Sequence, residues 1–340
     1  MRKEASLELW KELYEVTENI RILKPWNYFW DTDLIGIILR GEKEPVFCSI
    51  MGRESKCFGI SAYDGIEGLR DFDMIATLDE TDLPVEYVMY EQSSLTVYWG
   101  NKEEVPPDQA TIIKELGLRF KGNDNWPFFL SYKNRYVPFT PDEAEVIRLI
   151  DIFKNLFMVI RAVKEQRMNA RFDQGEFLLR TFNSETNLWN IFPAMLPAVE
   201  KEFPDISLDD EFLRKKLKKQ PVLDLEISLE FFYLNIAIRE DGYDRPINPL
   251  LFIALDDTND AIITVEMLKP EDEEIDMALG FFVGFVEQNG RMRKIKARNP
   301  WIMGTLGEIC EYCGIILEYD PLEKMDDIIE EIKNHGIKTE

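Results

Sequence analysis

The residues of this sequence best suited to chemistry are three carboxylates between two apolar runs. The segment PLLFIALDDTNDAIITVEMLKP, residues 249–270, places Asp256, Asp257 and Asp260 in a polar corner between two runs typical of β-strands. Carboxylate oxygens bind divalent cations, so these three residues are candidate metal ligands. The same residues favour a hairpin turn, because Asp and Asn side chains bond to the backbone two residues on. We favour the turn, since no carboxylate motif with metal-ligand spacing lies nearby.

Cysteine and histidine offer little further chemistry. Cys310 and Cys313 have the C-x-x-C spacing of a redox or zinc pair, but they fall at the C-terminal end of a predicted helix, where the helix dipole disfavours a thiolate. A zinc ion would need two more ligands, and Cys48, Cys57 and His335 show no paired spacing. His335 is also close to the chain end, a poor place for a catalytic base. With no GxxxxGK or GxGxxG phosphate loop either, we expect no catalytic residue and no cofactor.

Two basic islands stand out from an acidic background. They are candidate anion-binding residues if the fold brings them together, although charged runs are usually solvated faces. The first contains Arg214, Lys215, Lys216, Lys218 and Lys219, and the second contains Arg291, Arg293, Lys294, Lys296 and Arg298. The whole chain carries 40 Lys and Arg against 64 Asp and Glu, a formal charge of −24. This charge repels phosphate backbones and anionic lipids, so we expect neither nucleic acid nor membrane as partner and leave a protein partner open.

Length and composition predict a two-domain globular protein. The chain has 340 residues, of which 45% are apolar, enough for two cores. The first residues, MRKEASLELWKELYEV, place glutamates where a signal peptide needs an apolar region, and no run of about 18 apolar residues occurs. Four cysteines without a secretory signal favour reduced thiols, so we expect a cytoplasmic protein.

Periodicity in the first half predicts an α+β domain with an antiparallel sheet. We expect a helix over 5–21, a meander of strands over 34–39, 45–51 and 57–63, and a helix over 64–78. A β pair near 87–90 and 95–99 and a hairpin across 128–139 follow. Thr140-Pro141-Asp142-Glu143 reads as a capped helix start, with Glu143 closing a capping box, and that helix runs to about 164. The polar stretch after it places the domain boundary near residue 168, giving domains 1–168 and 169–340.

The second half predicts a mixed sheet with helices on its faces. We expect a helix over 188–203, then alternating β structure over 223–229 with a bulge or bend where the phase changes at Phe231-Phe232. Strands over 232–238, 250–255 and 261–267 come next, then a helix over 273–288 and a strand over 293–297. Asn299-Pro300 starts a helix that ends at Gly314, a strand covers 315–319, and Asp320-Pro321-Leu322-Glu323 opens the last helix.

Two motifs resemble a family of uncharacterised bacterial two-domain proteins. In PWNYFWDTDLIGI and VFCSIMGRESKCFGISAYDGIEGL, the residues that match the family pattern are Asp31, Asp33, Leu34, Gly36, Met51, Gly52, Phe58, Gly59, Tyr63, Gly65, Gly68 and Leu69. The second half resembles the accompanying domain through Arg245-Pro246, Pro249, Asp256 and CGIILEYDPL. The resemblance covers most of the chain and implies no assigned activity.

The second half also resembles, in the order of its elements, the ribonuclease H-like fold of integrases and nucleases. Those enzymes hold paired metal ions with an Asp in the middle of the first strand and another just after the fourth. On this resemblance the two positions fall near 235–237 and 298–299, and neither holds a carboxylate. The resemblance therefore implies the fold without the catalytic set.

Three function hypotheses follow. The leading one is a non-catalytic binding or interaction protein, since no histidine base, phosphate loop or complete carboxylate set is found. The alternative is a metal-dependent hydrolase or nuclease that uses Asp256 and Asp257 with carboxylates not aligned above, such as Glu226 or Glu230. The third is a nucleic-acid-binding module that uses the basic islands, with an affinity that falls steeply with salt.

Overall fold

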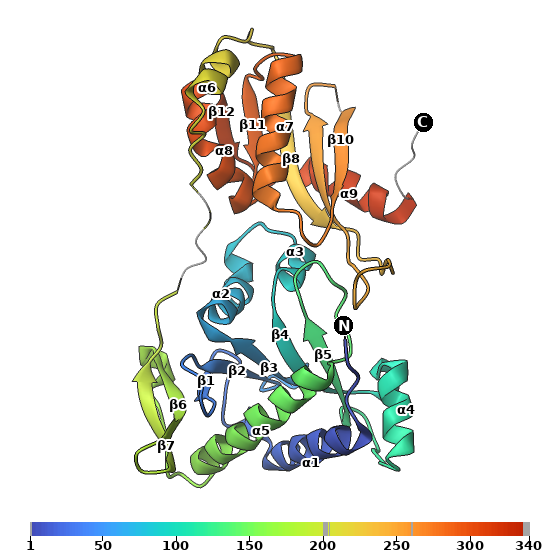
Figure 1. Ribbon diagram of the computed structural model, residues 1–340, viewed down its shortest axis with the longest axis vertical. Helices are drawn as coiled ribbons and strands as arrows, with labels where there is room; N and C mark the ends of the chain where they lie inside the picture. The colour runs from blue at the N-terminus through green and yellow to red at the C-terminus, as the bar shows by residue number, and fades with distance from the viewer. Residues whose placement is uncertain (1, 200–202, 204, 260, 336–340) are drawn as a thin grey trace. The chain divides into compact units, whose positions relative to one another are not determined.

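The protein folds as two compact units that are not simple halves of the chain. The computed structural model describes residues 2–199, 203, 205–259 and 261–335 (Figure 1). The first unit comprises residues 1–76, 92–133 and 138–200, and the second comprises 77–91, 134–137 and 201–340. Each unit is α+β and contains one mixed sheet. None of the helices in the described residues is long and apolar enough to cross a membrane.

The sheet of the first unit begins as the predicted meander. Its strand order within the described residues is β5-β4-β3-β2-β1-β6-β7, and every neighbouring pair is antiparallel except β1 and β6, which are parallel. The strands are β1 (Ile35–Ile38), β2 (Val46–Met51), β3 (Phe58–Asp64), β4 (Ser94–Gly100), β5 (Trp126–Tyr132), β6 (Glu176–Asn183) and β7 (Leu188–Met195).

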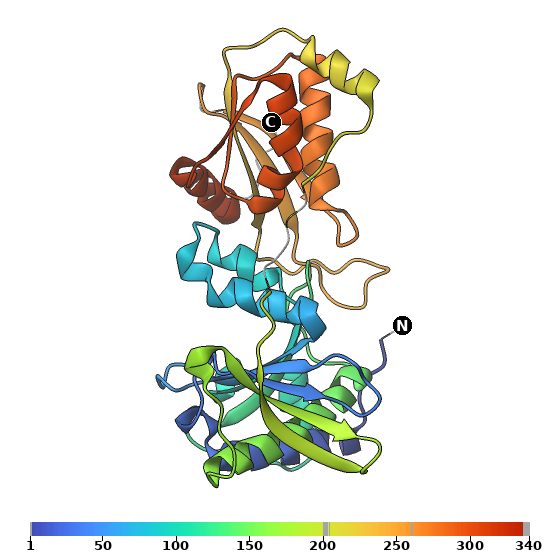
Figure 2. The same cartoon turned by 90° about the vertical axis from the view of Figure 1, so that its left-hand side faces the viewer.

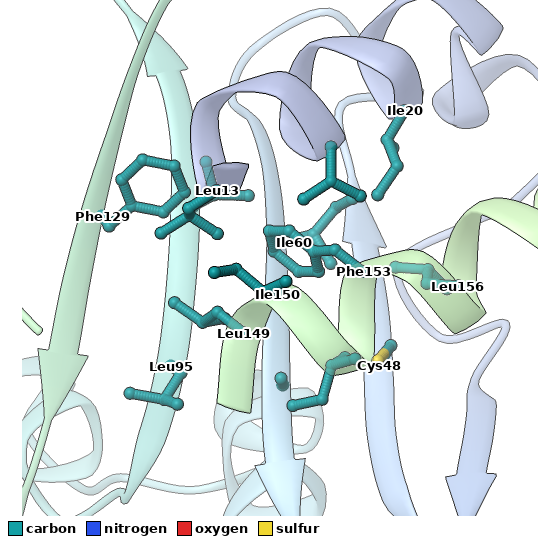
Figure 3. Close-up of a cluster of buried hydrophobic side chains, with 14 of the residues drawn as sticks. Leu13, Ile20, Cys48, Ile60, Leu95, Phe129, Leu149, Ile150, Phe153 and Leu156 are labelled. Carbon is teal, nitrogen blue, oxygen red and sulfur yellow. The ribbon is translucent and has the colours of Figure 1, made fainter. Parts of the chain in front are cut away.

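Two long helices build the core of this unit. The apolar residues of α1 (Leu7–Leu23) and α5 (Glu143–Lys164) recur three and four positions apart, which gives each helix one apolar face. Figure 3 shows these faces meeting the strands, with Leu13, Phe153 and Ile60 among the fully buried side chains. The helix start lies two residues later than predicted. Asp142 caps α5 and Glu145 closes the capping box, with N–O distances of 2.9 Å each way.

The unit boundary lies near residue 200, whereas the sequence placed it near 168. The difference arises because β6 pairs with β1, with Ile35 opposite Leu178, so β6 and β7 complete the first sheet. The polar stretch before β6 is a surface connection inside the unit. The predicted helix over 188–203 is wrong in its described part, since residues 188–195 form β7, which pairs along its whole length with β6.

The second unit has the ribonuclease H-like strand order expected from the sequence. Its sheet runs β10-β9-β8-β11-β12, in which the first three strands are antiparallel neighbours and β8, β11 and β12 are parallel. The strands are β8 (Glu226–Tyr233), β9 (Leu250–Asp256), β10 (Ala261–Leu268), β11 (Lys294–Ala297) and β12 (Ile316–Tyr319). The middle strand, β8, is almost wholly buried.

Helices cover both faces of this sheet (Figures 1 and 2). On one face, α7 (Glu274–Gln288) and α8 (Pro300–Cys313) pack on alternate residues of β8, including Ile227, Leu229 and Phe231. On the other face, Met325, Ile329 and Ile332 of α9 (Glu323–His335) pack on Phe232 and on residues of β9. The short helix α6 (Glu211–Lys218) joins the α7–α8 side.

The first strand of this sheet lies earlier than predicted. The sequence analysis expected it over 232–238 after a bend at Phe231-Phe232, but β8 runs unbroken from Glu226 to Tyr233. Apolar residues occur on both sides of its end because both faces are covered there, so the change of phase marks two-sided burial and not a bend.

Two short segments from the first half of the chain belong to the second unit. Residues 87–90, predicted as a strand, lie in the helix α3 (Val85–Tyr90), which packs on β8 through Tyr87 and Tyr233. A buried ion cluster holds both segments. Arg135 lies 2.8 Å from Glu274 and 3.6 Å from Glu91, and Tyr233 donates to Glu91 at 2.6 Å.

Replacing Arg135 with methionine tests whether this cluster secures the two segments. Arg135→Met keeps the side-chain volume but leaves Glu274 buried without a cation. We expect a loss of about 3–5 kcal/mol in the free energy of unfolding, measured by urea titration. Amide exchange should rise first in 85–91 and 134–137. The control Lys133→Met removes a half-exposed pair with Glu145 and should cost at most about 1 kcal/mol. Equal losses from the two variants would contradict the role of Arg135.

A matched pair of helical glycines tests close packing. A Cβ on Gly68 would lie 2.8 Å from the carbonyl carbon of Tyr63, so α2 (Gly65–Ala76) and β3 can touch only through glycine. We expect Gly68→Ala to destabilise the first unit by about 1–3 kcal/mol. Gly307 of α8 has open space around it, so Gly307→Ala should be neutral or stabilise by up to about 1 kcal/mol. Thermal unfolding measures both, and a harmless Gly68→Ala would refute the close approach.

Candidate functional site

Asp256 belongs to a hairpin turn. Asp256 is the last residue of β9. Its carboxylate accepts hydrogen bonds from the backbone N–H groups of Thr258 and Asn259 at 2.8 and 3.1 Å, and from the Asn259 side chain at 2.8 Å. These bonds, that from the Asn259 side chain first, lower the pKa of Asp256. An ionised cap fits the turn interpretation, because its oxygens are already used by the backbone of the turn. Asp260 lies outside the described residues.

Asp257 points to the sheet and not to the turn. Its carboxylate accepts from Ser228 of β8 at 2.9 Å and from Lys296 of β11 at 2.9 Å. Glu226 lies 3.5 Å from the same ammonium group. Asp257 and Glu226, both candidate metal ligands, are thus paired with the Lys296 ammonium group. No group of three or more His, Cys, Asp or Glu side chains in the described residues is arranged to hold a metal ion.

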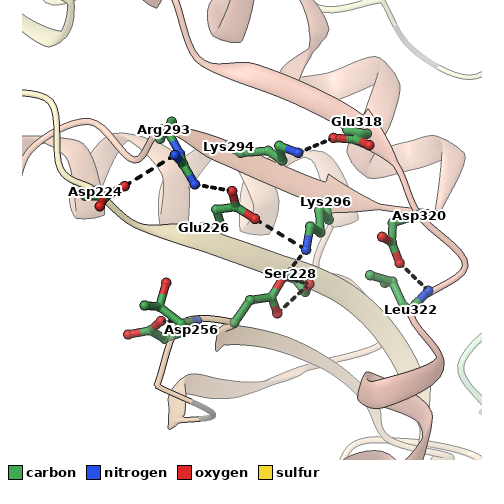
Figure 4. Close-up of polar contacts among 12 residues, drawn as sticks. Asp224, Glu226, Ser228, Asp256, Arg293, Lys294, Lys296, Glu318, Asp320 and Leu322 are labelled. Carbon is green, nitrogen blue, oxygen red and sulfur yellow. Dashed lines mark hydrogen bonds and ion pairs between the residues drawn. The ribbon is translucent and has the colours of Figure 1, made fainter.

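The contacts of Lys296 belong to a charged ladder on one face of the sheet (Figure 4). Along β8 the residues on this face are Glu226, Ser228 and Glu230, and along β11 and just beyond it they are Lys294, Lys296 and Arg298. The register places Lys294 opposite Glu226 and Lys296 opposite Ser228. Lys294 also pairs with Glu318 of β12 at 2.6 Å. We call Glu226, Ser228, Glu230, Lys294, Lys296 and Arg298 the charged ladder.

The second basic island is therefore neutralised within the unit. Three of its members belong to the charged ladder. Arg293 pairs with Glu226 and Asp224, and Arg291 donates to the backbone carbonyls of Gln220 and Cys313. An incoming anion would have to compete with these internal acceptors.

The first basic island, on and just after α6, is also internally paired. Arg214 pairs with Glu308, Lys215 with Glu211 and Lys216 with Glu287, while Arg214 and Lys218 lie over the ring of Tyr312. Lys219 is the C-cap residue of α6. The two islands approach each other at Cys313, where burial raises the thiol pKa and Arg291, Lys218 and Arg214 act in the opposite direction. Every member of the two islands except the exposed Lys219 thus contacts a carboxylate, a carbonyl or a ring of the described residues.

Three of the four cysteines are buried in the hydrophobic cores. Cys310 and Cys313 end α8, where Gly314 adopts a left-handed conformation, and both are buried. Burial raises the pKa of each thiol, which disfavours a reactive thiolate. Cys48 is buried in β2 and Cys57 is exposed in the first unit. His335 is the last residue of α9.

The most distinctive group in the second unit is an ion triad at the end of the charged ladder. Glu230 lies in the middle of β8, fully buried, and accepts from Arg298 Nε at 2.5 Å. Arg298 directly follows β11 and its two Nη atoms donate to Asp326 of α9. Its Nη1 also donates to the Pro321 carbonyl at 2.8 Å. One guanidinium therefore joins the first strand, the fourth strand and the last helix.

The charge state of the triad follows from burial and pairing. Burial raises the pKa of Glu230, and Arg298 and the Phe231 N–H act against that rise. Burial tends to lower the pKa of Arg298, but Asp326 and Glu230 outweigh it and leave the pKa raised. A guanidinium stays protonated at any physiological pH, so the centre of the triad carries a permanent positive charge.

A cavity of about 310 Å³ adjoins the triad within the second unit. Arg298 and Asp326 line it together with Tyr87 of α3, Tyr233 of β8 and Lys333 of α9. Lys333 lies 3.7 Å from Glu86 and 3.4 Å from Glu330. The cavity wall carries four carboxylates, those of Asp82, Glu86, Asp326 and Glu330, against the cations of Arg298 and Lys333, and this acidic excess disfavours a phosphate.

The triad was not predicted from the sequence, because the first strand of this sheet was expected too late in the chain. The aligned position near 235–237 lies beyond the end of β8, and the middle of the strand is Glu230. The position near 298–299 directly follows β11 and holds Arg298. A signal was present: the acidic alternation Glu226, Ser228, Glu230 matches the basic alternation Lys294, Lys296, Arg298.

The motif residues of the first unit serve its fold. Asp33 accepts from the Trp30 N–H at 2.8 Å, and Gly52 has a φ of +120°, a conformation that favours glycine. Beside them lies a cavity of about 220 Å³, where the Arg53 guanidinium stands 4.3 Å over the Trp30 ring. The shared pattern therefore reports turns and close packing.

Comparison with solved structures finds weak likenesses. The catalytic core domain of HTLV-2 integrase in complex with magnesium is 15% identical, with a TM-score of 0.24, covering 34% of this chain and 74% of that one. The simian T-cell lymphotropic virus intasome in complex with the PP2A regulatory subunit B56 gamma is 12% identical, with a TM-score of 0.24, covering 35% and 42%. A pre-cleavage Mos1 transpososome is 8% identical, with a TM-score of 0.19, covering 78% and 90%. These values assign no function.

Family models account for most of the sequence, as its motifs implied. No curated protein matches the chain. Residues 213–333 match the model described as domain of unknown function DUF6930. Residues 10–180, more than half of the chain, match the model described as domain of unknown function DUF7309. The chain therefore belongs to the DUF7309 family.

Proposed function

We propose that this chain is a non-catalytic binding protein whose second unit keeps a ribonuclease H-like scaffold with a guanidinium where the enzymes of that fold use metal ions. The observation that carries the proposal is the position of Arg298 between Glu230 and Asp326. Glu230 occupies the middle of the first strand and Arg298 directly follows the fourth strand.

Electrostatics supports this reading. A divalent cation at the triad would face a fixed positive charge, and displacing Arg298 would leave that charge without partners inside the protein. Glu230 already receives bonds from Arg298 and from the Phe231 N–H. The charged ladder supports the same reading, because Lys296 uses oxygens of both Asp257 and Glu226.

The partner and compartment are part of the proposal. The acidic charge of −24 disfavours nucleic acid and anionic lipid, so we propose a protein partner. All four cysteines are free thiols, which suits the reducing cytoplasm.

Replacing Arg298 tests the role of the triad. Arg298→Met leaves Glu230 buried without a cation, and we expect a loss of about 3–5 kcal/mol in unfolding free energy at neutral pH. Adding Glu230→Leu should recover most of that loss, because both charges are then gone. Lys294→Met, which breaks a more exposed pair with Glu318, is the control and should cost at most about 1 kcal/mol. A double variant no more stable than Arg298→Met would contradict the pairing.

A metal titration tests the absence of catalysis against the hydrolase alternative. We expect millimolar Mn²⁺ to leave the unfolding temperature of the purified protein unchanged, because bound metal would raise it. We also expect no turnover of single-stranded DNA, RNA or a bis-nitrophenyl phosphodiester. Turnover that is lost in both Asp257→Asn and Glu230→Gln, with Asp224→Asn unaffected as control, would establish the hydrolase and remove our proposal.

A further inference from the structure

A groove runs along the edge strand of the second unit, away from the triad. Within the described residues, β10 is the terminal strand of its sheet and pairs with β9 alone. Between β10 and α7 lies a groove of about 800 Å³. Its apolar floor consists of Ile263 of β10 and Met277, Phe281 and Phe285 of α7.

Two glycines keep this groove open. Gly280 and Gly284 line it, and a Cβ added at either would meet no atom within 4 Å. Glycine weakens a helix interior by about 1 kcal/mol relative to alanine. The helix thus carries two costly residues at the positions where a side chain would fill the groove.

The rim of the groove is acidic and lacks internal cations. It is formed by Glu266, Glu271, Asp272, Glu273 and Asp276. Glu271 accepts from the Tyr243 hydroxyl and Asp272 caps the Lys269 N–H, but none of the five pairs with a cation of the described residues. This contrasts with the charged ladder, where Lys and Arg neutralise the carboxylates. The rim presents a concentrated negative potential that a cationic partner can match.

The opposite face of β10 is apolar at the same edge. Ile262 is 49% exposed and Met267 is 50% exposed, and their register partners on β9, Leu255 and Leu251, are buried. Edge strands are usually protected by lysine, proline or short length. β10 spans eight residues and contains no lysine and no proline. The register shift between Ile262 and Thr264 leaves Thr264–Leu268 regularly paired.

We propose that β10 accepts an added β-strand from a partner protein, in which lysine or arginine alternates with apolar residues. Strand addition satisfies the free backbone groups of an edge, and alternation sends side chains to the two faces. Basic side chains would lay their aliphatic stems on Phe281 and Phe285 and bring their charges to the rim. Apolar side chains would cover Ile262 and Met267. This inference names the partner class of the proposed binding function and rests on it.

Charge argues against a second copy as the occupant. Two β10 strands paired with each other would bring two acidic rims together, and each chain carries a net charge of −24. Like charges in one interface cost affinity. The groove therefore selects a basic segment.

The test uses the whole protein and a labelled ten-residue peptide in which lysine alternates with valine or leucine. Fluorescence anisotropy measures the affinity, and amide exchange measures protection of residues 262–268. We expect binding that weakens with salt and protects β10. A peptide of the same composition, with its lysines in one block, should bind at least tenfold more weakly, as should a glutamate-alternating peptide.

Variants separate the groove from non-specific attraction. Gly284→Leu fills the groove and Glu266→Lys reverses a rim charge, and each should weaken binding at least tenfold. Gly307→Leu on α8, whose surroundings are also open, is the matched control and should bind like the parent protein. A thermal melt checks that each variant is folded.

Each remaining outcome overturns the inference. Equal binding of the alternating and block peptides, or no loss in Gly284→Leu and Glu266→Lys, would mean simple charge attraction. A self-association that Gly284→Leu abolishes would make a second copy the occupant. No binding would remove the basic strand as partner, while the unfolding and metal titrations of the triad variants would still decide the binding-protein proposal.

Discussion

The second unit depends on the neutralisation of one buried carboxylate, that of Glu230, by the Arg298 guanidinium. Glu230 is a carboxylate in the middle of the central strand, without any exposed surface, and Arg298 is the cation that makes this burial tolerable. Because the same guanidinium reaches Asp326 and the Pro321 carbonyl, it also fixes where α9 starts against the sheet. A single side chain thus sets the spacing of three elements.

The unit separates two kinds of acidic surface. The carboxylates of β8 face the cations on and just after β11 and are compensated by them, which leaves little potential for a ligand. Along β10 and the start of α7, carboxylates gather beside apolar side chains, and no cation of the described residues pairs with them. The first arrangement contributes to the fold, and the second is the surface that we propose for recognition. An overall charge of −24 conceals this division, since it says only that carboxylates exceed cations.

Much of the fold could be predicted from the sequence, because local signals such as helix caps determine where many elements begin and end. Asn299-Pro300 and Gly314 mark the two ends of α8, and Asp320-Pro321 precedes the start of α9, while the strand order of the second unit was implied by the resemblance of its element order to the ribonuclease H-like fold. The elements that were predicted wrongly are those whose structure depends on pairing with distant segments of the chain. Residues 188–195 form a strand because β6 lies beside them, and 87–90 form a helix because β8 offers an apolar face. The other two members of the triad, Arg298 and Asp326, lie 68 and 96 positions after Glu230, so the triad depends on the same long-range pairing.

The second unit contains two segments that lie within the sequence range of the first unit, and this limits how the second unit can be transferred between genes. Residues 77–91 and 134–137 lie within the sequence of the first unit but complete the second, where α3 covers Tyr233 and Arg135 reaches Glu274. A gene fragment that encodes only 201–340 would lack these parts and expose the end of β8. A recombination that transfers only 201–340 therefore does not carry the whole of the second unit, although the two family models match separate ranges of the sequence.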